Sequence, residues 1–402
     1  MQHQTWLFLC ICFFHILPTM SDISKCQHQQ STFNCSGVGL QNIPDGKDLP
    51  PDLKILDLSN NNITRVPLLN FSESVSSSLI QIFLNHNQIN SIQNFSFIKL
   101  TSLETLDLSY NFLSGYDLDD NIFTNMSSLQ ELILDQNPLH IIRRLTFTML
   151  EIPALRRLSL AHCDLIDLEN SAIGFNTLNV LNLSGNRLNS ASLKNLPILI
   201  MMDFNTLDLS HNEITLLDNF NFPSVNGLMN LILDHNHITS LRLMYVSLYQ
   251  IQTISLRYNN LRTLDNNSLH WDLTTLRYID FRDNPIVCDC NISWLLLDPK
   301  QKTKTVRIIC NSPPALKGRN LFDLKVSDLN CTDPHDNHNH PDNQNLIPIV
   351  IGVVLASCML CVVAGVLAYM IRKRRQRENS KSPGIKSYGS VVQNPSNSPS
   401  KS

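Results

Sequence analysis

The 402-residue sequence contains little glycine, only 12 residues. Glycine-rich loops that cradle phosphates and the G-x-S-x-G elbow of serine hydrolases both need glycine at set spacings. Neither pattern occurs, and the H-E-x-x-H pattern of zinc peptidases is also absent. Because the chain has no catalytic constellation, we expect a protein that is not an enzyme and that holds no cofactor or metal.

Positive net charge is confined to the last residues. The whole chain has a formal net charge of −3, but residues 372–402 carry eight Lys or Arg and one Glu. This segment therefore has a net charge of +7, and the residues before it sum to −10. Because binding to nucleic acids is dominated by neutralisation of phosphates, an acidic chain of this kind is not expected to bind them.

Long apolar runs occur only near the two ends. The run Trp6–Leu17 is too short to cross a bilayer and predicts a secretory signal peptide over residues 1–21. Residues 346–371 contain no charged side chain, which predicts a transmembrane helix. Arg372–Arg375 follow it directly and place residues 372–402 in the cytoplasm. We therefore expect a single-pass type I protein of the plasma membrane.

Short motifs in these terminal segments allow more than one interpretation. Gly352 and Ala356 form a small-xxx-small pair that could contact the helix of a co-receptor or could simply face lipid. Tyr388 and Val391 fit a tyrosine-based sorting signal for cycling to endosomes, although such four-residue patterns also occur by chance.

Most of the chain is an internal repeat. The template L-x-x-L-x-L-x-x-N-x-L occurs ten times over residues 53–286, from LKILDLSNNNI to LRYIDFRDNPI, at spacings of 23 to 26 residues. Because a single repeat cannot bury its apolar side alone, the repeats must stack. We expect an α/β solenoid, a leucine-rich-repeat horseshoe whose short strands form one parallel sheet on the concave face.

The ninth template position is asparagine in nine repeats and Cys163 in the fifth. An asparagine amide there can bond to backbone groups of neighbouring turns that would otherwise be buried without partners. The template also accepts cysteine at this position. Cys163 is therefore expected to be a buried and unreactive thiol, although it has no neighbouring cysteine in the sequence.

Cysteines flank the repeats in even numbers, which in a secreted chain implies disulfides. Two lie in an N-terminal cap (22–52), before the SGVGLQNIP stretch, and four lie in a C-terminal cap (287–332), which begins CDCNISWLL. On these motifs the chain resembles cysteine-capped extracellular leucine-rich-repeat receptors over residues 26–332, and its N-terminal cap is similar to that of Toll-like receptors. The resemblance implies the pairs Cys26–Cys35, Cys288–Cys310 and Cys290–Cys331.

The same resemblance has a limit. The signalling domain of Toll-like receptors needs well over roughly a hundred residues, whereas the expected cytoplasmic tail has 31. We therefore expect no signalling through that family's adaptor route by this chain alone.

Ligand contacts are expected on the concave face. At the eighth template position, histidines could form a pH-dependent ladder, or LSHN could simply be a common form of the repeat. The candidate contacts are outward strand residues together with the histidines at the eighth position: Phe83, His86, Ile133, Arg157, His162, His211, Ile232 and His235.

Two acidic or histidine-rich segments raise the question of a metal. Residues 333–345 contain three histidines and three aspartates, and Asp117, Asp119 and Asp120 lie in the third repeat. A polar juxtamembrane stalk and a solvated loop account for them without a metal, because nothing in the sequence would hold the ligands in a fixed geometry.

Nine Asn-x-Ser/Thr sequons predict a glycoprotein. Asn182 lies mid-strand, so a glycan there would obstruct the middle of the concave face. The sequons are at Asn34, Asn62, Asn70, Asn94, Asn125, Asn182, Asn266, Asn291 and Asn330.

Together these features favour a cell-surface receptor or co-receptor that binds a protein or microbial macromolecule through its repeats, in innate immune recognition. The alternative is a neural or epithelial adhesion or matrix-interaction protein without an immune role.

Overall fold

A computed structural model gives the fold of the chain, and all its described residues belong to one compact unit that ends at Cys331. Among these residues no helix is both long and apolar enough to cross a membrane. The expected signal peptide, stalk, transmembrane segment and tail, with Asn266, Tyr388 and Val391, lie outside the described residues. The described ranges are 23–118, 121–143, 146–148, 152–169, 173–174, 177–196, 204–218, 227–242, 250–264, 275–297 and 305–331.

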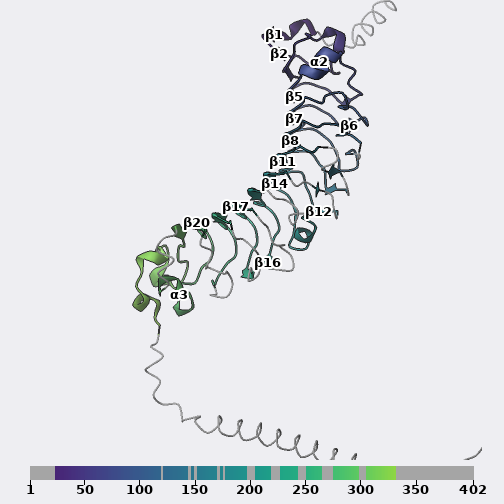
Figure 1. Ribbon diagram of the computed structural model, residues 1–402. Coiled ribbons are helices and arrows are strands. Elements are labelled where there is room, and N and C mark those ends of the chain that lie inside the picture. Colours follow the sequence, from purple (N-terminus) through teal and green to yellow (C-terminus); the bar gives the residue numbers. More distant parts are fainter. Residues whose placement is uncertain are drawn as a thin grey trace, which may run out of the picture. The chain divides into compact units, whose positions relative to one another are not determined.

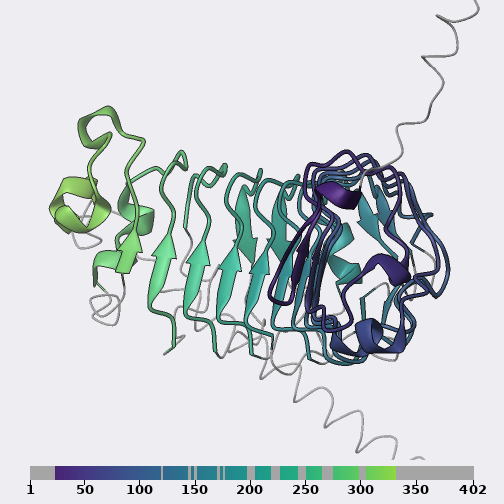
Figure 2. The ribbon, with the colours of Figure 1, turned by 90° about the horizontal axis from the view of Figure 1, so that it is seen from above.

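Each of the ten repeats contributes one three-residue strand at template positions three to five. Neighbouring strands pair in parallel, and equivalent template positions lie opposite each other, as Leu56 does with Ile82. Figure 2 shows the strand arrows side by side and pointing the same way. The strands are β3 (Ile55–Asp57), β5 (Gln81–Phe83), β7 (Thr105–Asp107), β8 (Glu131–Ile133), β11 (Arg157–Ser159), β14 (Val180–Asn182), β15 (Thr206–Asp208), β17 (Asn230–Ile232), β19 (Thr253–Ser255) and β20 (Tyr278–Asp280).

The caps extend this sheet at both ends, so that it has 13 strands among the described residues (Figure 1). In the N-terminal cap, β1 (Gln27–Gln29) runs antiparallel to β2 (Thr32–Asn34), which pairs with β3. In the C-terminal cap, β21 (Thr305–Arg307) pairs in parallel with β20. The caps contain the disulfides Cys26–Cys35, Cys288–Cys310 and Cys290–Cys331, the pairs that the resemblance implied.

The core follows from the alternation along each strand. The middle residue is buried while its neighbours are half-exposed in most repeats, as in β7, where Leu106 is inside. Leu108, two residues after it, is also buried, and Phe97, Phe123 and Phe147 fill the space behind the sheet. Since burying one such side chain contributes roughly 1.5–3 kcal/mol, the stacked repeats hold one another together through a shared core.

The structure is a solenoid built on one long, mostly parallel sheet, and the α part of the expected α/β solenoid is limited to short helices among the described residues. Their only α-helices are α2 (Glu73–Ser78), whose N-cap Ser72 accepts a hydrogen bond from the Val75 N–H, and α3 (Trp294–Leu297). The other outer segments that the structure describes form short strands and single 3-10 turns.

The outer strands also pair in parallel, two by two: β4 (Arg65–Val66) with β6 (Ser91–Ile92), β9 (Ile141–Ile142) with β12 (Asp167–Leu168), β10 (Phe147–Thr148) with β13 (Ile173–Gly174), and β16 (Leu216–Asp218) with β18 (Ser240–Arg242). The 3-10 helices are Ile23–Lys25, Gly46–Asp48, Ser192–Asn195, Cys290–Ile292, Pro314–Leu316, Leu321–Asp323 and Val326–Leu329.

The asparagines at template position nine form a ladder of buried hydrogen bonds between repeats. The Asn212 amide donates to the carbonyls of Leu183 in the preceding repeat (3.0 Å) and Leu209 in its own (3.1 Å). Its Oδ1 accepts the Leu188 N–H at 3.0 Å. The Leu209 carbonyl also accepts from Asn236, so each asparagine is joined to the next. This arrangement confirms that the asparagines satisfy backbone groups of neighbouring turns.

Cys163 takes the place of one asparagine in this ladder. Its thiol donates to the Leu134 carbonyl at 3.3 Å, as an asparagine amide would. The thiol does not replace the side-chain oxygen with which an asparagine accepts an N–H from the preceding repeat. The N–H concerned, that of Leu139, donates to the Asn137 carbonyl at 2.8 Å, in a turn around Pro138. This tight turn satisfies the backbone locally. Burial raises the pKa of the Cys163 thiol to about 12.

We expect the variant Asn212→Ala to lower the free energy of unfolding by about 3 kcal/mol, because it leaves the buried Leu188 N–H without a partner and removes bonds to two carbonyls. Urea denaturation monitored by circular dichroism measures the change. The control variant His237→Ala, at an exposed position of the next repeat, should change stability by less than about 0.5 kcal/mol. Equal effects of the two variants would contradict the role of the ladder.

Native Cys163 should resist alkylation by iodoacetamide, because the reactive thiolate is scarce at a pKa of about 12 and the side chain is buried. Peptide mass spectrometry of native protein should show an unmodified Cys163, and the same protein unfolded in guanidinium should be labelled there. Rapid labelling of the native protein would show that the thiol is accessible.

Candidate ligand-binding surface

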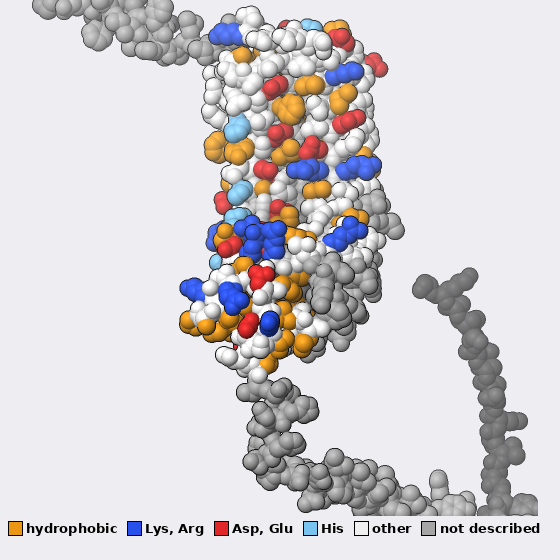
Figure 3. Space-filling model, turned by 90° about the vertical axis from the view of Figure 1, so that its left-hand side faces the viewer, with side chains coloured by type: hydrophobic (Ala, Val, Ile, Leu, Met, Phe, Trp, Pro, Cys, Tyr) orange, Lys and Arg blue, Asp and Glu red, His pale blue; other side chains and the backbone are white. Residues whose placement is uncertain are grey.

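The outward side chains of the sheet form one continuous surface. We call it the strand face and define it by template positions three, five, seven and eight of each repeat, which Figure 3 views from the front. Phe83, Ile133 and Ile232 lie on it half-buried, and Arg157 is exposed and forms an ion pair with Glu131 at 3.0 Å. The structure thus places all four predicted strand contacts on one surface, although in separate repeats.

The eighth template position forms one edge of the strand face and has an unusual backbone. All ten residues there have φ between 53° and 68°, the left-handed region, which histidine and asparagine enter more readily than most residues. Adjacent strands lie about 4.8 Å apart, which is close to the spacing of stacked rings. Side chains at this position therefore meet the equivalent side chain of the next repeat.

Histidine and tyrosine rings stack along this edge. The ring centroids of His211 and His235 lie 4.2 Å apart, and those of His235 and Tyr258 also lie 4.2 Å apart. His86 stacks separately on Tyr110 at 4.1 Å. The structure therefore joins only two of the four predicted histidines, and we call His211, His235 and Tyr258 the ring row.

Gly185 determines where the ring of His162, the remaining predicted histidine, lies. A Cβ at this position would come within 2.2 Å of the His162 ring, so the ring of repeat five occupies the space that a side chain of repeat six would need. The glycine, with a φ of 68°, thus separates His162 from direct stacking on His211.

The surroundings of His211 favour its neutral form. Burial lowers the pKa of His211 below its ordinary value of 6.5, and the neighbouring His235 and His162 lower it further. The carboxylates of Asp208 and Asp234 act in the opposite direction but do not outweigh these effects.

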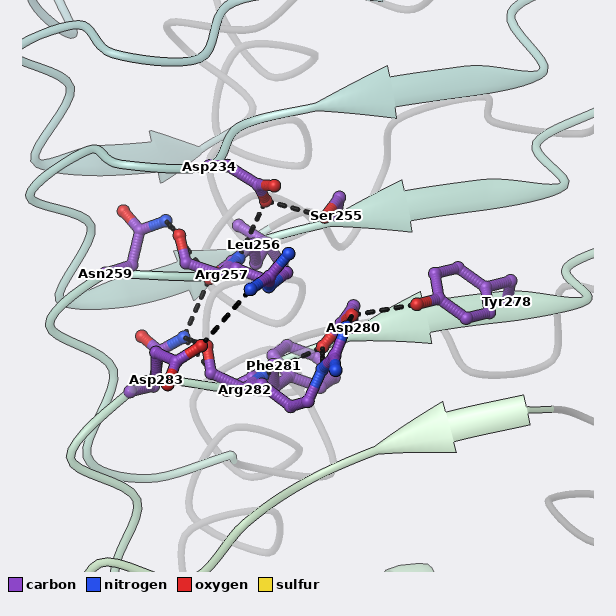
Figure 4. Close-up of polar contacts among 11 residues, drawn as sticks. Asp234, Ser255, Leu256, Arg257, Asn259, Tyr278, Asp280, Phe281, Arg282 and Asp283 are labelled. Carbon is purple, nitrogen blue, oxygen red and sulfur yellow. Dashed lines mark hydrogen bonds and ion pairs between the residues drawn. The ribbon is translucent and has the colours of Figure 1, made fainter.

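A second feature, in the last two repeats, was missed from the sequence (Figure 4). The carboxylate of Asp280 on β20 is only 1% exposed and accepts hydrogen bonds from Arg282, at 2.9 Å to Nε and 2.6 Å to Nη2. The Tyr278 hydroxyl donates to it at 2.8 Å. Burial raises the pKa of Asp280, but these hydrogen bonds outweigh burial and hold it below its ordinary value. The carboxylate is therefore charged and fixed.

Two further arginines lie beside this group. The Arg257 guanidinium lies over the Tyr258 ring at 5.1 Å, and its Nη2 is 3.6 Å from a carboxylate oxygen of Asp283. Arg307 of β21 lies over the Tyr278 ring at 5.5 Å. The sequence signal was arginine at position seven in the last two repeats, where the earlier repeats have Ser, Asn, Asp or Ala.

Comparison with known proteins agrees with the repeat architecture. Profiles of the leucine rich repeat match residues 51–113 and 102–125. Tsukushi of Xenopus tropicalis is 33% identical over 201 residues, which cover 50% of this chain and 55% of Tsukushi. Toll-like receptor 9 of Mus musculus is 28% identical over 270 residues, 64% of this chain and 23% of the receptor. The chain thus spans less than two thirds of either relative.

The fold also matches a solved structure. FLRT2, in an octameric complex with Latrophilin 3 and Unc5D, superimposes with a TM-score of 0.62 at 21% identity, covering 76% of this chain and 99% of that one. The chain is a cysteine-capped leucine-rich-repeat protein that resembles a Toll-like receptor ectodomain. These likenesses apply to the repeats and caps and leave the ligand open.

Seven of the nine predicted sequons of this leucine-rich-repeat protein are exposed, and Asn266 is not described. Asn182 is half-buried on β14: its Oδ1 accepts the Ser184 N–H at 3.0 Å and its Nδ2 donates to Ser159 Oγ at 3.1 Å. A glycan at Asn182 would replace a hydrogen of that Nδ2 on the strand face. Glycosylation at each sequon stays a prediction.

The sequence analysis expects no metal site in the acidic and histidine-rich segments. Among the described residues no group of three His, Cys, Asp or Glu side chains is placed to hold a metal ion. Asp119, Asp120 and the stalk lie outside these residues.

The variant His235→Ser should raise the pKa of His211, because it removes a positive charge that disfavours protonation. Since the folded-state pKa of His211 is lowered, the folded protein is favoured above pH 6.5 and loses that stabilisation as the pH falls below it. Histidine NMR titration measures the change, with Tyr116→Ser, an exposed ring outside the ring row, as the control. An unchanged pKa of His211 in the variant would contradict coupling within the row.

Proposed function

We propose that this protein is a single-pass type I cell-surface receptor or co-receptor that binds a macromolecular ligand on its strand face. The observation that carries the proposal is the ring row beside Arg257, an exposed and rigid surface in repeats seven to nine. Tyrosine and arginine are enriched at the energetic centres of protein interfaces. Rings held by stacking lose little conformational freedom on binding, which favours affinity.

The position of Asn182 also favours ligand contacts in repeats seven to nine. It lies on β14, the strand of the sixth repeat, so a glycan there would cover the middle of the strand face. The ring row begins in the seventh repeat and extends away from Asn182 toward the C-terminal cap. We therefore assign the main ligand contacts to the C-terminal half of the solenoid.

We infer an innate immune role, supported by the similarity to Toll-like receptor 9 over 64% of this chain. Tsukushi and FLRT2, which assembles with Latrophilin 3 and Unc5D in its solved complex, support the alternative of adhesion or matrix interaction. In both versions the partner is a protein or a microbial macromolecule other than a nucleic acid, because the residues before the basic tail are acidic.

We also propose roles for the C-terminal segments in anchoring and sorting the protein. Residues 346–371 anchor the protein in the plasma membrane, and Gly352 and Ala356 offer a contact for the helix of a signalling co-receptor. Tyr388 and Val391 direct cycling to endosomes.

Binding to cells that display the full chain tests the function. A panel of tagged cell-surface proteins and microbial products is applied, and the immune version predicts a microbial ligand whereas the adhesion version predicts a cell-surface protein. For the ligand found, the variant Tyr258→Ala should weaken binding at least about 10-fold, the loss expected for a central interface tyrosine. Tyr116→Ala, at an exposed ring outside the ring row, should leave binding unchanged. Equal binding to both variants would contradict the proposed surface.

A further inference from the structure

The charge of the strand face changes sign along the solenoid. At template positions five and seven, repeats one to eight contain no Lys or Arg. The next three coils each contribute one arginine at these positions: Arg257, Arg282 and, on the cap strand β21, Arg307, which pairs in register with Asp280. Figure 3 shows Lys and Arg side chains gathered on this part of the surface. We call these three residues the arginine cluster. The acidic residues at the same positions of the first eight repeats are Asp57, Asp107, Asp135, Asp208 and Asp234.

The arginines of the cluster differ in how strongly they are hydrogen-bonded or paired to other side chains of the protein. Arg282 is bonded to the buried carboxylate of Asp280 through Nε and Nη2. This pair neutralises the buried carboxylate of Asp280 and fixes the Arg282 side chain, which remains 34% exposed. Arg282 is therefore a rigid support with a partly exposed guanidinium.

Arg257 is only weakly engaged. Its contact with Asp283 spans 3.6 Å, and both side chains are a third or more exposed, so the pair contributes little in water. Among the described residues, the buried Nε of Arg257 has no hydrogen-bond partner. The backbone N–H of Arg257 donates to Asp234 Oδ1 at 2.8 Å and anchors the residue from below. Because the Arg257 side chain is 33% exposed and its contact with Asp283 is weak, its guanidinium can present N–H donors to a ligand.

Tyrosine rings hold the two outer guanidiniums in place. Tyr258 lies under Arg257, and Tyr278, whose hydroxyl is bonded to Asp280, lies under Arg307. A guanidinium stacked on a ring presents its N–H edge in a fixed plane, and that fork matches the two oxygens of a carboxylate. The cluster is therefore arranged for planar acidic groups rather than for diffuse negative charge.

We propose that the arginine cluster binds carboxylate side chains of an acidic segment on a protein partner. This inference rests on the proposed function and adds the chemistry of the ligand. A long sulfated polysaccharide fits less well, because Asp234 and Asp283 adjoin the cluster and the earlier repeats present further acids. A short acidic segment can contact the arginines without reaching the acidic residues of the earlier repeats, and the difference in charge along the strand face sets its orientation.

The test uses the full chain in nanodiscs and two probes, a biotinylated octaglutamate peptide and a heparin octasaccharide of similar length. The double variant Arg257→Gln/Arg307→Gln should raise the Kd for octaglutamate at least about 10-fold, since two charge-assisted contacts are lost. The control variant Arg187→Gln/Arg319→Gln removes two exposed arginines outside the cluster and should leave the Kd unchanged. Arg257→Lys should be intermediate, because it keeps the charge but loses the planar fork.

Charge reversal separates lost recognition from a damaged fold. Arg257→Glu/Arg307→Glu should lose octaglutamate binding and keep the circular dichroism spectrum and urea denaturation midpoint of the parent protein, which a misfolded protein would not do. Octaglutamate binding unchanged in the double glutamine variant overturns the proposal, and so does tighter binding of heparin through the same two arginines. If the natural ligand needs Tyr258 but not the arginine cluster, the proposed function stands and this inference fails.

Discussion

The hydrogen-bonded asparagine ladder is the constraint on which the other features of this solenoid depend. Each leucine-rich turn buries backbone carbonyls that water cannot reach, and the amides at position nine bond to them from two successive repeats. Leaving one such group without a partner would cost roughly 1–3 kcal/mol, comparable with what one buried leucine contributes. The ladder therefore sets the register between repeats, and Cys163 shows its tolerance: a thiol donates in place of the amide, while the turn at Pro138 compensates for the missing acceptor.

A fixed register converts sequence periodicity into columns of side chains on the surface. Residues 23 to 26 positions apart in the chain become neighbours about 4.8 Å apart in the sheet. For this reason histidine and tyrosine at position eight stack into the ring row, and arginines in three successive coils gather into one cluster. At position eight the backbone requires only a left-handed conformation, and residues as different as histidine, tyrosine and aspartate are found there.

The strand face thus combines a rigid apolar edge with a basic end, separated from the N-terminal repeats by the sequon at Asn182. That combination suits a folded protein partner more than a small molecule, because the described surface offers extended rows of side chains rather than a deep enclosed site. Sequence similarity to both Tsukushi and Toll-like receptor 9 fits this division, because the repeat template carries the ladder and the core, whereas the outward columns lie outside it.

The sequence by itself determined the parts of this protein that repeat. The template predicted the strand positions, the buried leucines, the ladder asparagines and the inert site of Cys163, because each depends on a residue's place within one repeat. It did not predict the short strands and 3-10 turns of the described outer segments, since those segments have no comparable period. Only the tertiary structure decided which outward side chains meet. Gly185 separates His162 from the ring row, Arg282 is held by a buried Asp280, and Arg257 is only weakly paired with Asp283, because these outcomes depend on side-chain directions between adjacent coils.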